Sequence, residues 1–133
     1  MSISLALDFQ QNLHRSMDSD EELKSMVSNI YQSIKQYSKY PYILQHVNKV
    51  KLLKHRINSY EMEGEINIYI RESNFGNFKN IISRIEAVFY LQRNLETYSY
   101  ISGRIIDAEF IPSQDLMTTR FKMGYQSLIQ GRA

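Results

Sequence analysis

Cysteine and tryptophan are both absent from the 133 residues of this chain. Without cysteine, the chain cannot build a disulfide framework, use thiol catalysis or bind a metal through thiolates. Proline occurs only twice and glycine five times. The five glycines are isolated from one another, so the sequence contains no glycine-rich phosphate-binding loop.

Long hydrophobic runs and a charge excess are also missing. No run of 18 apolar residues occurs, so the sequence predicts no membrane-spanning helix, and no basic segment precedes the first apolar residues, so we expect no secretory signal. The 16 Lys+Arg nearly balance the 14 Asp+Glu, and the net charge of +2 is too small to indicate nucleic-acid binding by itself. With 43% hydrophobic and 23% charged residues, the composition predicts one globular domain over residues 1–133.

Three segments have the features of helices. Leu5, Phe9, Leu13 and Met17 recur every four residues and predict an amphipathic first helix. A capping box, in which Ser19 precedes Glu22 by three positions, predicts a short second helix that continues to about residue 27. Over 77–90, apolar residues recur every three or four positions, which predicts a third helix with a wide buried stripe.

Five further segments are rich in β-branched and aromatic residues and predict strands at 30–34, 40–53, 62–70, 106–110 and 121–126. The alternation over 62–70 is the most regular and is typical of a strand with one buried face. We expect 35–39 to form a polar bend, 97–103 a connection, and 113–116 a turn that follows Pro112. The predicted fold is α+β, in the order α-(α)-β-β-β-α-β-β, with a mostly antiparallel sheet of about five strands and helices packed on one face.

Charge complementarity favours one pairing of the two middle strands. If they form an antiparallel hairpin and the numbers of paired residues sum to an even value, Lys49 and Lys51 share a face with Glu61, Glu63 and Glu65. A sum of 114, for example, pairs Lys51 with Glu63 and Lys49 with Glu65. Opposite charges across strands contribute a few tenths to about 1 kcal/mol per pair. The same pairing would place two polar residues of the first strand on the apolar face.

The two polar residues are His46 and Asn48. Neither they nor the other histidines indicate a metal or catalytic site. His14, His46 and His55 lie on different predicted elements, whereas a metal needs three or four converging ligands. No serine lies in a nucleophile-elbow motif. The three glutamates at 61–65 could bind a cation or act as paired carboxylates, but nothing nearby would separate their pKa values, so we favour a solvated face. The sequence therefore predicts no catalytic residue, no metal site, no cofactor and no enzymatic activity.

A basic cluster lies close in sequence to several of the ten tyrosines. Its members are Lys49, Lys51, Lys54, His55 and Arg56, and the neighbouring aromatic residues are Tyr40, Tyr42 and Tyr60. A positively charged surface with aromatic platforms is typical of proteins that bind single-stranded nucleic acid. Tyrosine is equally enriched at protein–protein interfaces, so the same composition is consistent with extensive subunit contact.

The order of the segments resembles that of a known protein family. An amphipathic helix, a short acidic helix, a strand with a Pro-Tyr pair, an alternating strand, a glycine-initiated helix and a terminal hairpin follow one another. The residues that carry the resemblance are Leu5–Leu13, Ile30-Tyr31, Tyr40–Leu44, Glu65–Arg71, Gly76–Phe89 and Phe121–Leu128. In this order and spacing the chain resembles the tail-completion, or tail-terminator, proteins of long-tailed phages and phage-derived gene transfer agents.

The resemblance implies a structural virion assembly protein. Family members form a hexameric ring on the head-proximal end of the finished tail tube, which ends tube polymerisation and provides the head–tail joining surface. The implied partners are copies of the chain itself, the tail tube protein and the head–tail connector proteins, with DNA only passing through the lumen and no membrane. The implied location is a virion tail or phage-like particle assembled in the host cytoplasm.

Contact residues are expected at the sheet edges and in the polar loop 54–60, because loops on rigid scaffolds carry binding surfaces. We expect Lys54, His55, Arg56 and Tyr60 to contact the tube or a neighbouring subunit. Two alternatives stay open at this point. One is a head-closure, or stopper, protein at the portal, and the other is a small basic nucleic-acid-binding module.

Overall fold

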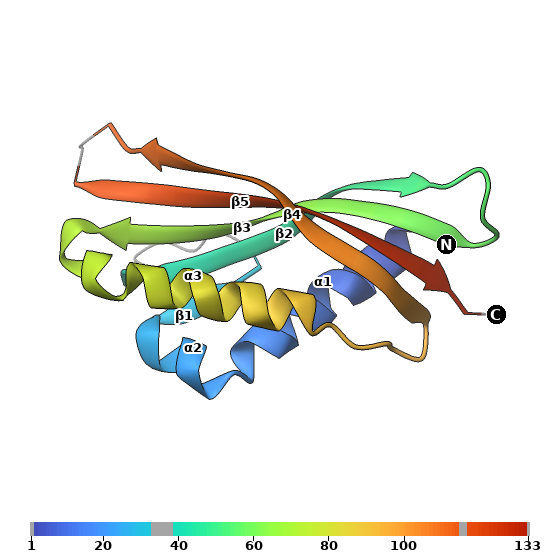
Figure 1. Cartoon of the computed structure of the whole chain (residues 1–133), viewed down its shortest axis with the longest axis horizontal. Coiled ribbons are helices and arrows are strands. Elements are labelled where there is room, and N and C mark those ends of the chain that lie inside the picture. The colour runs from blue at the N-terminus through green and yellow to red at the C-terminus, as the bar shows by residue number, and fades with distance from the viewer. Residues whose placement is uncertain (1, 33–38, 115–116, 133) are drawn as a thin grey trace.

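The computed structural model describes residues 2–32, 39–114 and 117–132. A five-stranded sheet is covered on one face by three helices and is open on the other (Figure 1). The elements are α1 (Ser2–Asp18), α2 (Glu21–Met26), β1 (Asn29–Tyr31), β2 (Tyr42–Leu52), β3 (Ser59–Arg71), a 3₁₀ turn η1 (Glu72–Asn74), α3 (Phe75–Tyr90), β4 (Tyr98–Pro112) and β5 (Thr118–Gly131). Over the described residues, no helix is long and apolar enough to cross a membrane.

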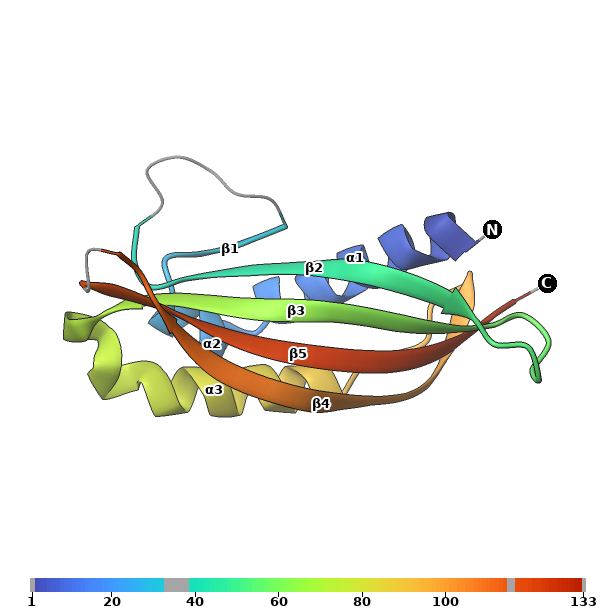
Figure 2. The same ribbon diagram turned by 90° about the horizontal axis from the view of Figure 1, so that it is seen from above.

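The strands lie in the order β1-β2-β3-β5-β4, as Figure 2 shows from above. β1 pairs with β2 in parallel, and the other three pairings are antiparallel. This arrangement confirms the predicted α+β class, the element order, the mostly antiparallel sheet and the placement of the helices on one face. β4 forms one outer edge of the sheet, and the three-residue β1 covers only the start of β2 at the other edge.

The core lies between the sheet and the helices and uses the residues that their periodicity predicts. Phe9, Leu13 and Met17 of α1 are fully buried, and Phe9 packs against Tyr125 of β5 with ring centroids 6.0 Å apart. In α3 the buried residues recur every three or four positions, from Phe78 to Phe89. Burying each large apolar side chain contributes about 1.5–3 kcal/mol, which fixes these helices to the sheet.

The cap of α2 differs from the prediction by one residue. Asp20, not Ser19, is the N-cap, and its Oδ1 accepts a hydrogen bond of 2.9 Å from the backbone N–H of Leu23. The hydroxyl of Ser19 instead donates to the carbonyl of Arg15 in the last turn of α1. Serine and aspartate are both good N-caps, so capping preference alone does not select Asp20. A second contact, which Asp20 makes with α3, explains why it is the cap.

In the hairpin of β2 and β3 the lysines and glutamates share one face, as predicted, but the register differs from the suggested one. Lys49 pairs with Glu63 and Lys51 with Glu61, a sum of 112 rather than 114. The register then shifts by one residue between Val47 and Lys49, because Asn48 forms a bulge. Beyond the bulge, the face of each β2 side chain is reversed relative to an unbroken strand.

This bulge removes the unfavourable feature of the predicted register. His46 pairs with Glu65 on the charged face, away from the apolar face. The polar residue that does lie on the helix-covered face is Gln45, which is fully buried. Its Nε2 donates a hydrogen bond of 3.0 Å to the carbonyl of Gln10 in α1.

The ends of several strands also differ from the prediction, and β3 and β5 are longer than predicted at both ends. β4 begins at Tyr98, so the predicted connection over 97–103 is wrong. Two bulges, at Ile101 and Ile106, interrupt the alternation of side chains in this strand. The first half of the strand therefore lacks the alternating sequence pattern by which a strand is predicted. β1 ends at Tyr31 and does not include Gln32, and the predicted positions 33–38 and 115–116 lie outside the described residues.

Candidate interaction surfaces

The loop between β2 and β3, residues 53–58, extends beyond one end of the sheet and is called the tip loop below (Figure 2). Lys54, His55 and Arg56 are all exposed in it, and the side chain of Ile57 is 89% exposed. Asn58 closes the loop with a φ of 56°, and its carbonyl accepts a hydrogen bond from the N–H of Gly131. The loop is therefore tied to the end of β5 and presents two permanent positive charges and one large apolar side chain.

Tyr60, which was expected to belong to this loop, lies in β3 on the helix-covered face. Only 9% of its surface is exposed, and it belongs to the hydrophobic core. The even-numbered positions of β3 point toward the helices, so Tyr60 follows from the alternation that also buries Met62 and Ile66.

The open face of the sheet carries ordered charges. The Nζ of Lys122 in β5 lies 3.5 Å from Oε2 of Glu65, and the Nε2 of His46 in β2 lies 3.7 Å from Oε1. Burial opposes ionisation of Glu65, but hydrogen bonds from Asn67 and Asn48 and the charge of Lys122 outweigh it and lower the pKa of this carboxyl. A general acid needs a raised pKa, so this carboxylate is suited to structural pairing rather than to proton donation.

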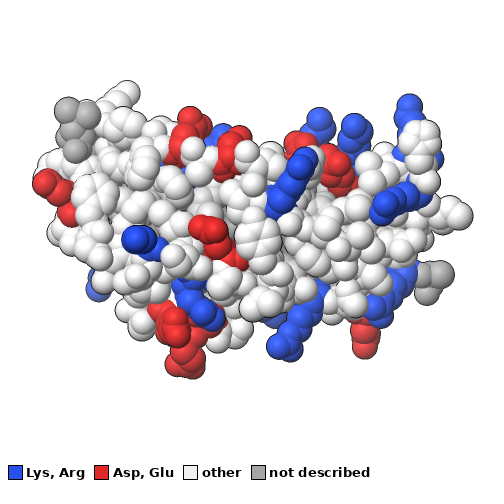
Figure 3. Space-filling model, in the orientation of Figure 1, with Lys and Arg blue, Asp and Glu red and all other residues white. Residues whose placement is uncertain are grey.

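A second row of polar contacts crosses the same face. The guanidinium of Arg104 in β4 donates to Oε1 of Gln126 in β5 at 2.9 Å, and Nε2 of Gln126 donates to Glu61 of β3 at 2.8 Å. On the side of the molecule seen in Figure 3, positive and negative side chains are interspersed rather than gathered by sign. This side of the molecule therefore carries no single-sign stripe of the kind that nucleic-acid binding requires.

Of the three tyrosines next to the basic cluster in sequence, Tyr60 is buried in the core, and Tyr40 and Tyr42 lie away from the basic tip loop. Tyr42 stacks on Tyr69 with ring centroids 4.6 Å apart and contacts Tyr40 at 5.3 Å. Tyr42 begins β2 and the tip loop follows its end, so ten residues of strand, about 33 Å, separate them. The structure therefore does not bring the basic cluster and its aromatic neighbours into one binding surface.

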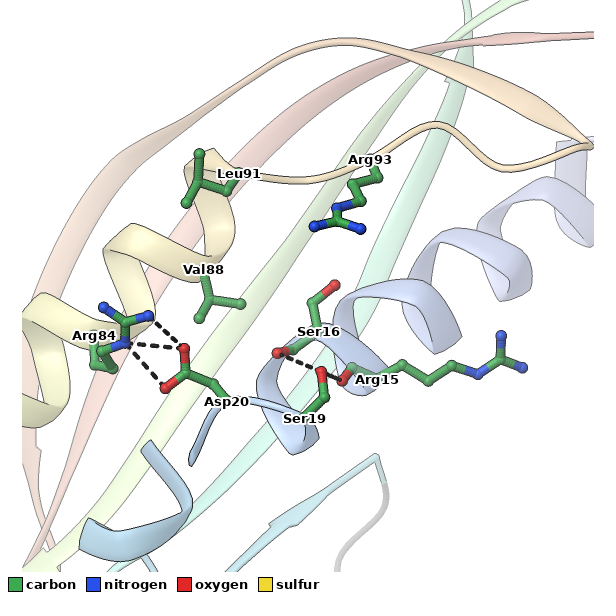
Figure 4. Close-up of a pocket in the computed structure, with 8 residues that line it drawn as sticks. All are labelled: Arg15, Ser16, Ser19, Asp20, Arg84, Val88, Leu91 and Arg93. Carbon is green, nitrogen blue, oxygen red and sulfur yellow. Dashed lines mark hydrogen bonds and ion pairs between the residues drawn. The ribbon is translucent and has the colours of Figure 1, made fainter. Parts of the chain in front are cut away.

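A pocket of about 350 Å³ lies between α1, the start of α2 and α3 (Figure 4). Arg84 of α3 points at Asp20 on one side of it, and Arg93 extends into it from the segment after α3. The Nη2 of Arg84 lies 2.6 Å from Oδ2 of Asp20 and its Nε lies 3.7 Å from Glu22. The positive charge of Arg84 is thus already neutralised, whereas Arg15 and Arg93, which also line the pocket, form no ion pair within 4.0 Å with a described residue.

The histidines do not converge. His14 is half-buried in α1, His46 lies beside Glu65, and His55 is exposed in the tip loop. Within residues 2–32, 39–114 and 117–132, no group of three or more histidine or carboxylate side chains could hold a metal ion.

The edge strand β4 exposes several large apolar side chains. Ile101, Ile106 and Phe110 are all exposed along it, and Tyr90 and Leu91 at the end of α3 are exposed beside it. Phe110 also packs on Phe121, so the strand is not a detached arm. Sequence reasoning identified the sheet edges only in general terms, because the length of β4 was not predicted.

Proteins similar to this chain are found by comparing structures and not by comparing sequences. No family model matches the chain, and no curated protein matches it in sequence. A chain from the virion of a native gene transfer agent particle has the same fold, with a TM-score of 0.73 at 9% identity over 92% of this chain and 94% of that chain. The gp17 protein of bacteriophage SPP1 matches with a TM-score of 0.63 at 15% identity over 92% of this chain and 89% of that chain.

The chain has the fold of a virion protein. These two structures come from a gene transfer agent and from a phage, the two kinds of particle that the segment order implied, so the predicted resemblance is confirmed at the level of fold. At identities of 9% and 15% few residues are shared. The surfaces described above must therefore be interpreted from their own chemistry.

Proposed function

We propose that this protein is a structural subunit of a phage-like particle that caps the head-proximal end of the tail tube. The observation that carries the proposal is the fold likeness to a chain of a gene transfer agent virion, which includes nearly the whole of both chains. In this proposal six copies close into a ring, end the polymerisation of the tube and provide the surface to which the head connector binds. The protein then has no catalytic role.

The physical basis of capping is a ring with two unlike faces. A growing tube end exposes a repeating surface, and a ring that matches it on one face only prevents the addition of further tube subunits. Such a ring uses heterologous joints, in which two different surfaces of the subunit meet and the rotation between copies closes. Weak contacts of the single subunits add up because six of them engage the tube together.

The tip loop is the proposed contact with the tube or with the next subunit. Lys54, His55 and Arg56 are exposed there next to the exposed Ile57, a combination of charge and apolar surface that suits a protein partner. Tyr60 contributes through the base of the loop, because its side chain is buried. DNA passes through the lumen of the ring in this proposal and does not require a base-reading surface.

The experiment is electron microscopy and native mass measurement of the purified protein, alone and mixed with purified tail tubes. We expect rings of about six copies, free in solution or on one end of each tube, and no further tube growth at capped ends. Binding to an isolated portal complex in place of the tube would assign the stopper function. A protein that stays monomeric and binds neither particle would overturn the proposal.

A further inference from the structure

The two outer edges of the sheet have unlike surfaces. One edge is β4, and the other is formed by β2 together with α1, because β1 pairs only with residues 42–44 of β2. Figure 2 shows that these edges lie on opposite sides of the subunit. A heterologous ring needs two different, complementary surfaces on opposite sides of each subunit.

The β4 edge is apolar, and beyond Arg104, whose guanidinium contacts Gln126 on the open face, its charged residues are acidic. Ile101 and Ile106, the two bulged residues, are 45% and 47% exposed. Asp107 lies over Gly124 at the open face, where a Cβ would collide with its carboxylate. Glu109 is exposed and reaches Lys122 only at 3.9 Å. Among the described residues, Asp107 has no cationic partner within 4.0 Å, so this edge carries negative charge that is not fully neutralised.

The opposite edge is apolar and basic. A notch of about 140 Å³ lies between α1 and β2 at the Asn48 bulge, lined mainly by apolar side chains that include Val47 and Val50. Leu7 on its rim is 55% exposed. Lys49 lines the notch as well, and Lys51 follows it on the open face. In the part of the chain that the structure describes, neither lysine forms an ion pair within 4.0 Å, although Glu63 and Glu61 lie directly across from them on β3.

The backbone of both edges is partly closed to strand addition. The N–H of Val47 in β2 donates to Oε1 of Gln10 at 2.9 Å. In β4, the N–H of Ile105 donates to the hydroxyl of Tyr90 at 3.1 Å and that of Tyr100 to Oδ1 of Asn94 at 2.7 Å. Capped donors and bulges oppose extension of a sheet by another strand. Contacts between these edges must therefore be made by side chains.

We propose that the β4 edge of one copy docks against the α1–β2 edge of the next, with Ile106 in the notch and Asp107 and Glu109 facing Lys49 and Lys51. The occupant of each edge is a second copy of this chain, and the proposal rests on the ring function above because it supplies the joint of that ring. The charges favour this joint over a symmetric one. Two β4 edges would bring acid against acid, and two α1–β2 edges would bring lysine against lysine, which is repulsive.

Charge reversal with mixing tests the joint. The variant Asp107→Lys/Glu109→Lys has two basic edges, and the variant Lys49→Glu/Lys51→Glu has two acidic edges. Each variant alone should require an at least tenfold higher protein concentration to assemble. An equimolar mixture should restore rings in which the two variants alternate. Native mass measurement distinguishes alternating rings from rings of one variant, and it is carried out with and without tail tubes.

Two matched controls carry the same charge changes on the helical side of the molecule. They are Glu72→Lys/Glu86→Lys and Lys24→Glu/Lys79→Glu, at exposed positions of η1, α2 and α3. Both should assemble like the unmodified chain. Assembly of both edge variants alone, while the unmodified chain forms rings, overturns this joint and leaves the capping function intact. An unmodified chain that forms no ring under either condition overturns both.

The absence of cysteine allows a second test that does not depend on charge. In Lys49→Cys/Ile106→Cys, the two thiols of one copy lie on β2 and β4, three strand spacings or about 14 Å apart. This exceeds the Cα separation of about 7 Å that a disulfide can bridge. Mild oxidation should therefore give a ladder of covalent multimers up to the closed ring. Each single variant should give dimers at most, and a double variant without a ladder overturns the joint.

Discussion

The guanidinium of Arg84 in α3 donates hydrogen bonds to the carboxylate of Asp20, which is also the N-cap of α2. Nε of Arg84 donates to Oδ1 at 3.0 Å and to Oδ2 at 2.9 Å, and Nη2 donates to Oδ2 at 2.6 Å. The hydrogen bond to Arg84 lowers the pKa of Asp20 and outweighs the opposing effect of burial. One carboxylate thus fixes the short helix α2 to α3 across 64 positions of sequence.

Asp20→Asn and Asp20→Ala should separate the two roles of this side chain. Asparagine keeps the cap and loses the ion pair, which at this partly exposed site is worth up to about 1 kcal/mol. Alanine also loses the cap, for a further loss of about 1 kcal/mol. Urea unfolding of the three proteins measures both steps, and equal stabilities for the two variants would contradict a capping role.

The pH dependence of the same pair has a defined sign. Because folding lowers the pKa of Asp20, its contribution to stability is present above the ordinary carboxyl value of about 3.9 and is lost as the pH falls through the lowered value. The difference in unfolding free energy between the unmodified chain and Asp20→Asn should therefore shrink below about pH 4. A difference that stays constant down to pH 2 would contradict the ion pair.

Gln10 and Gln45 form a polar bridge whose two members should respond differently to substitution. Gln10→Ala leaves the N–H of Val47 without its acceptor, which costs about 1–3 kcal/mol if water cannot replace it. Gln45→Leu should change the stability by less than about 1 kcal/mol. Its buried Oε1 has no partner among the described residues, and leucine suits the apolar face of β2. Thermal unfolding of both variants tests the predicted order.

Gly64 and Gly76 offer a matched pair of glycine substitutions. A Cβ on Gly64 would collide with the carbonyl oxygen of His46 and the hydroxyl of Tyr125, so Gly64→Ala should cost about 1–3 kcal/mol. Around Gly76, in the first turn of α3, no atom lies within 4 Å of such a Cβ. Gly76→Ala should therefore stabilise the fold by up to about 1 kcal/mol. Denaturant midpoints of the two variants should move in opposite directions.

Buried tyrosines predict a loss of stability at alkaline pH. Burial raises the pKa of Tyr98 to about 12, although a hydrogen bond from Asn12 opposes the shift. Burial and the neighbouring Tyr40 and Tyr69 raise the pKa of Tyr42 to about 12 as well. For a raised pKa, the contribution to stability is present below the unfolded value of about 10 and is lost as the pH rises toward 12. Tyr98→Phe should weaken this pH dependence in unfolding curves measured between about pH 9 and 11.

The parts of the fold that periodicity specifies could be predicted from the sequence. The stripe of α1, the stripe of α3 and the alternation of β3 all follow from side chains that must face one core. The face shared by Lys49 and Glu63 followed from charge pairing between strands. Each of these features depends on residues that are close in sequence or related by one hairpin.

The missed features depend on irregular backbone or on distant contacts. The bulges at Asn48, Ile101 and Ile106 break the period of two, so the register of β2 and the first half of β4 could not be obtained by counting. The choice of Asp20 over Ser19 as the cap required knowledge of Arg84, which no local motif provides. The alternation of β3 could have placed Tyr60 in the core, had the strand been extended to its start at Ser59.

The charges of the tip loop are expected to affect function rather than stability. Lys54→Glu/Arg56→Glu should lower tail-capping activity at least tenfold, because it reverses both permanent charges of an exposed loop that the proposed function places against the tube. Neither side chain forms an ion pair with a described residue, so thermal unfolding should stay within about 0.5 kcal/mol of the unmodified chain. Lys24→Glu/Lys79→Glu changes the net charge equally on the helical side and should cap normally. Normal particle yield from the loop variant would assign tube contact to another surface, whereas loss of capping by both variants would indicate a general effect of charge.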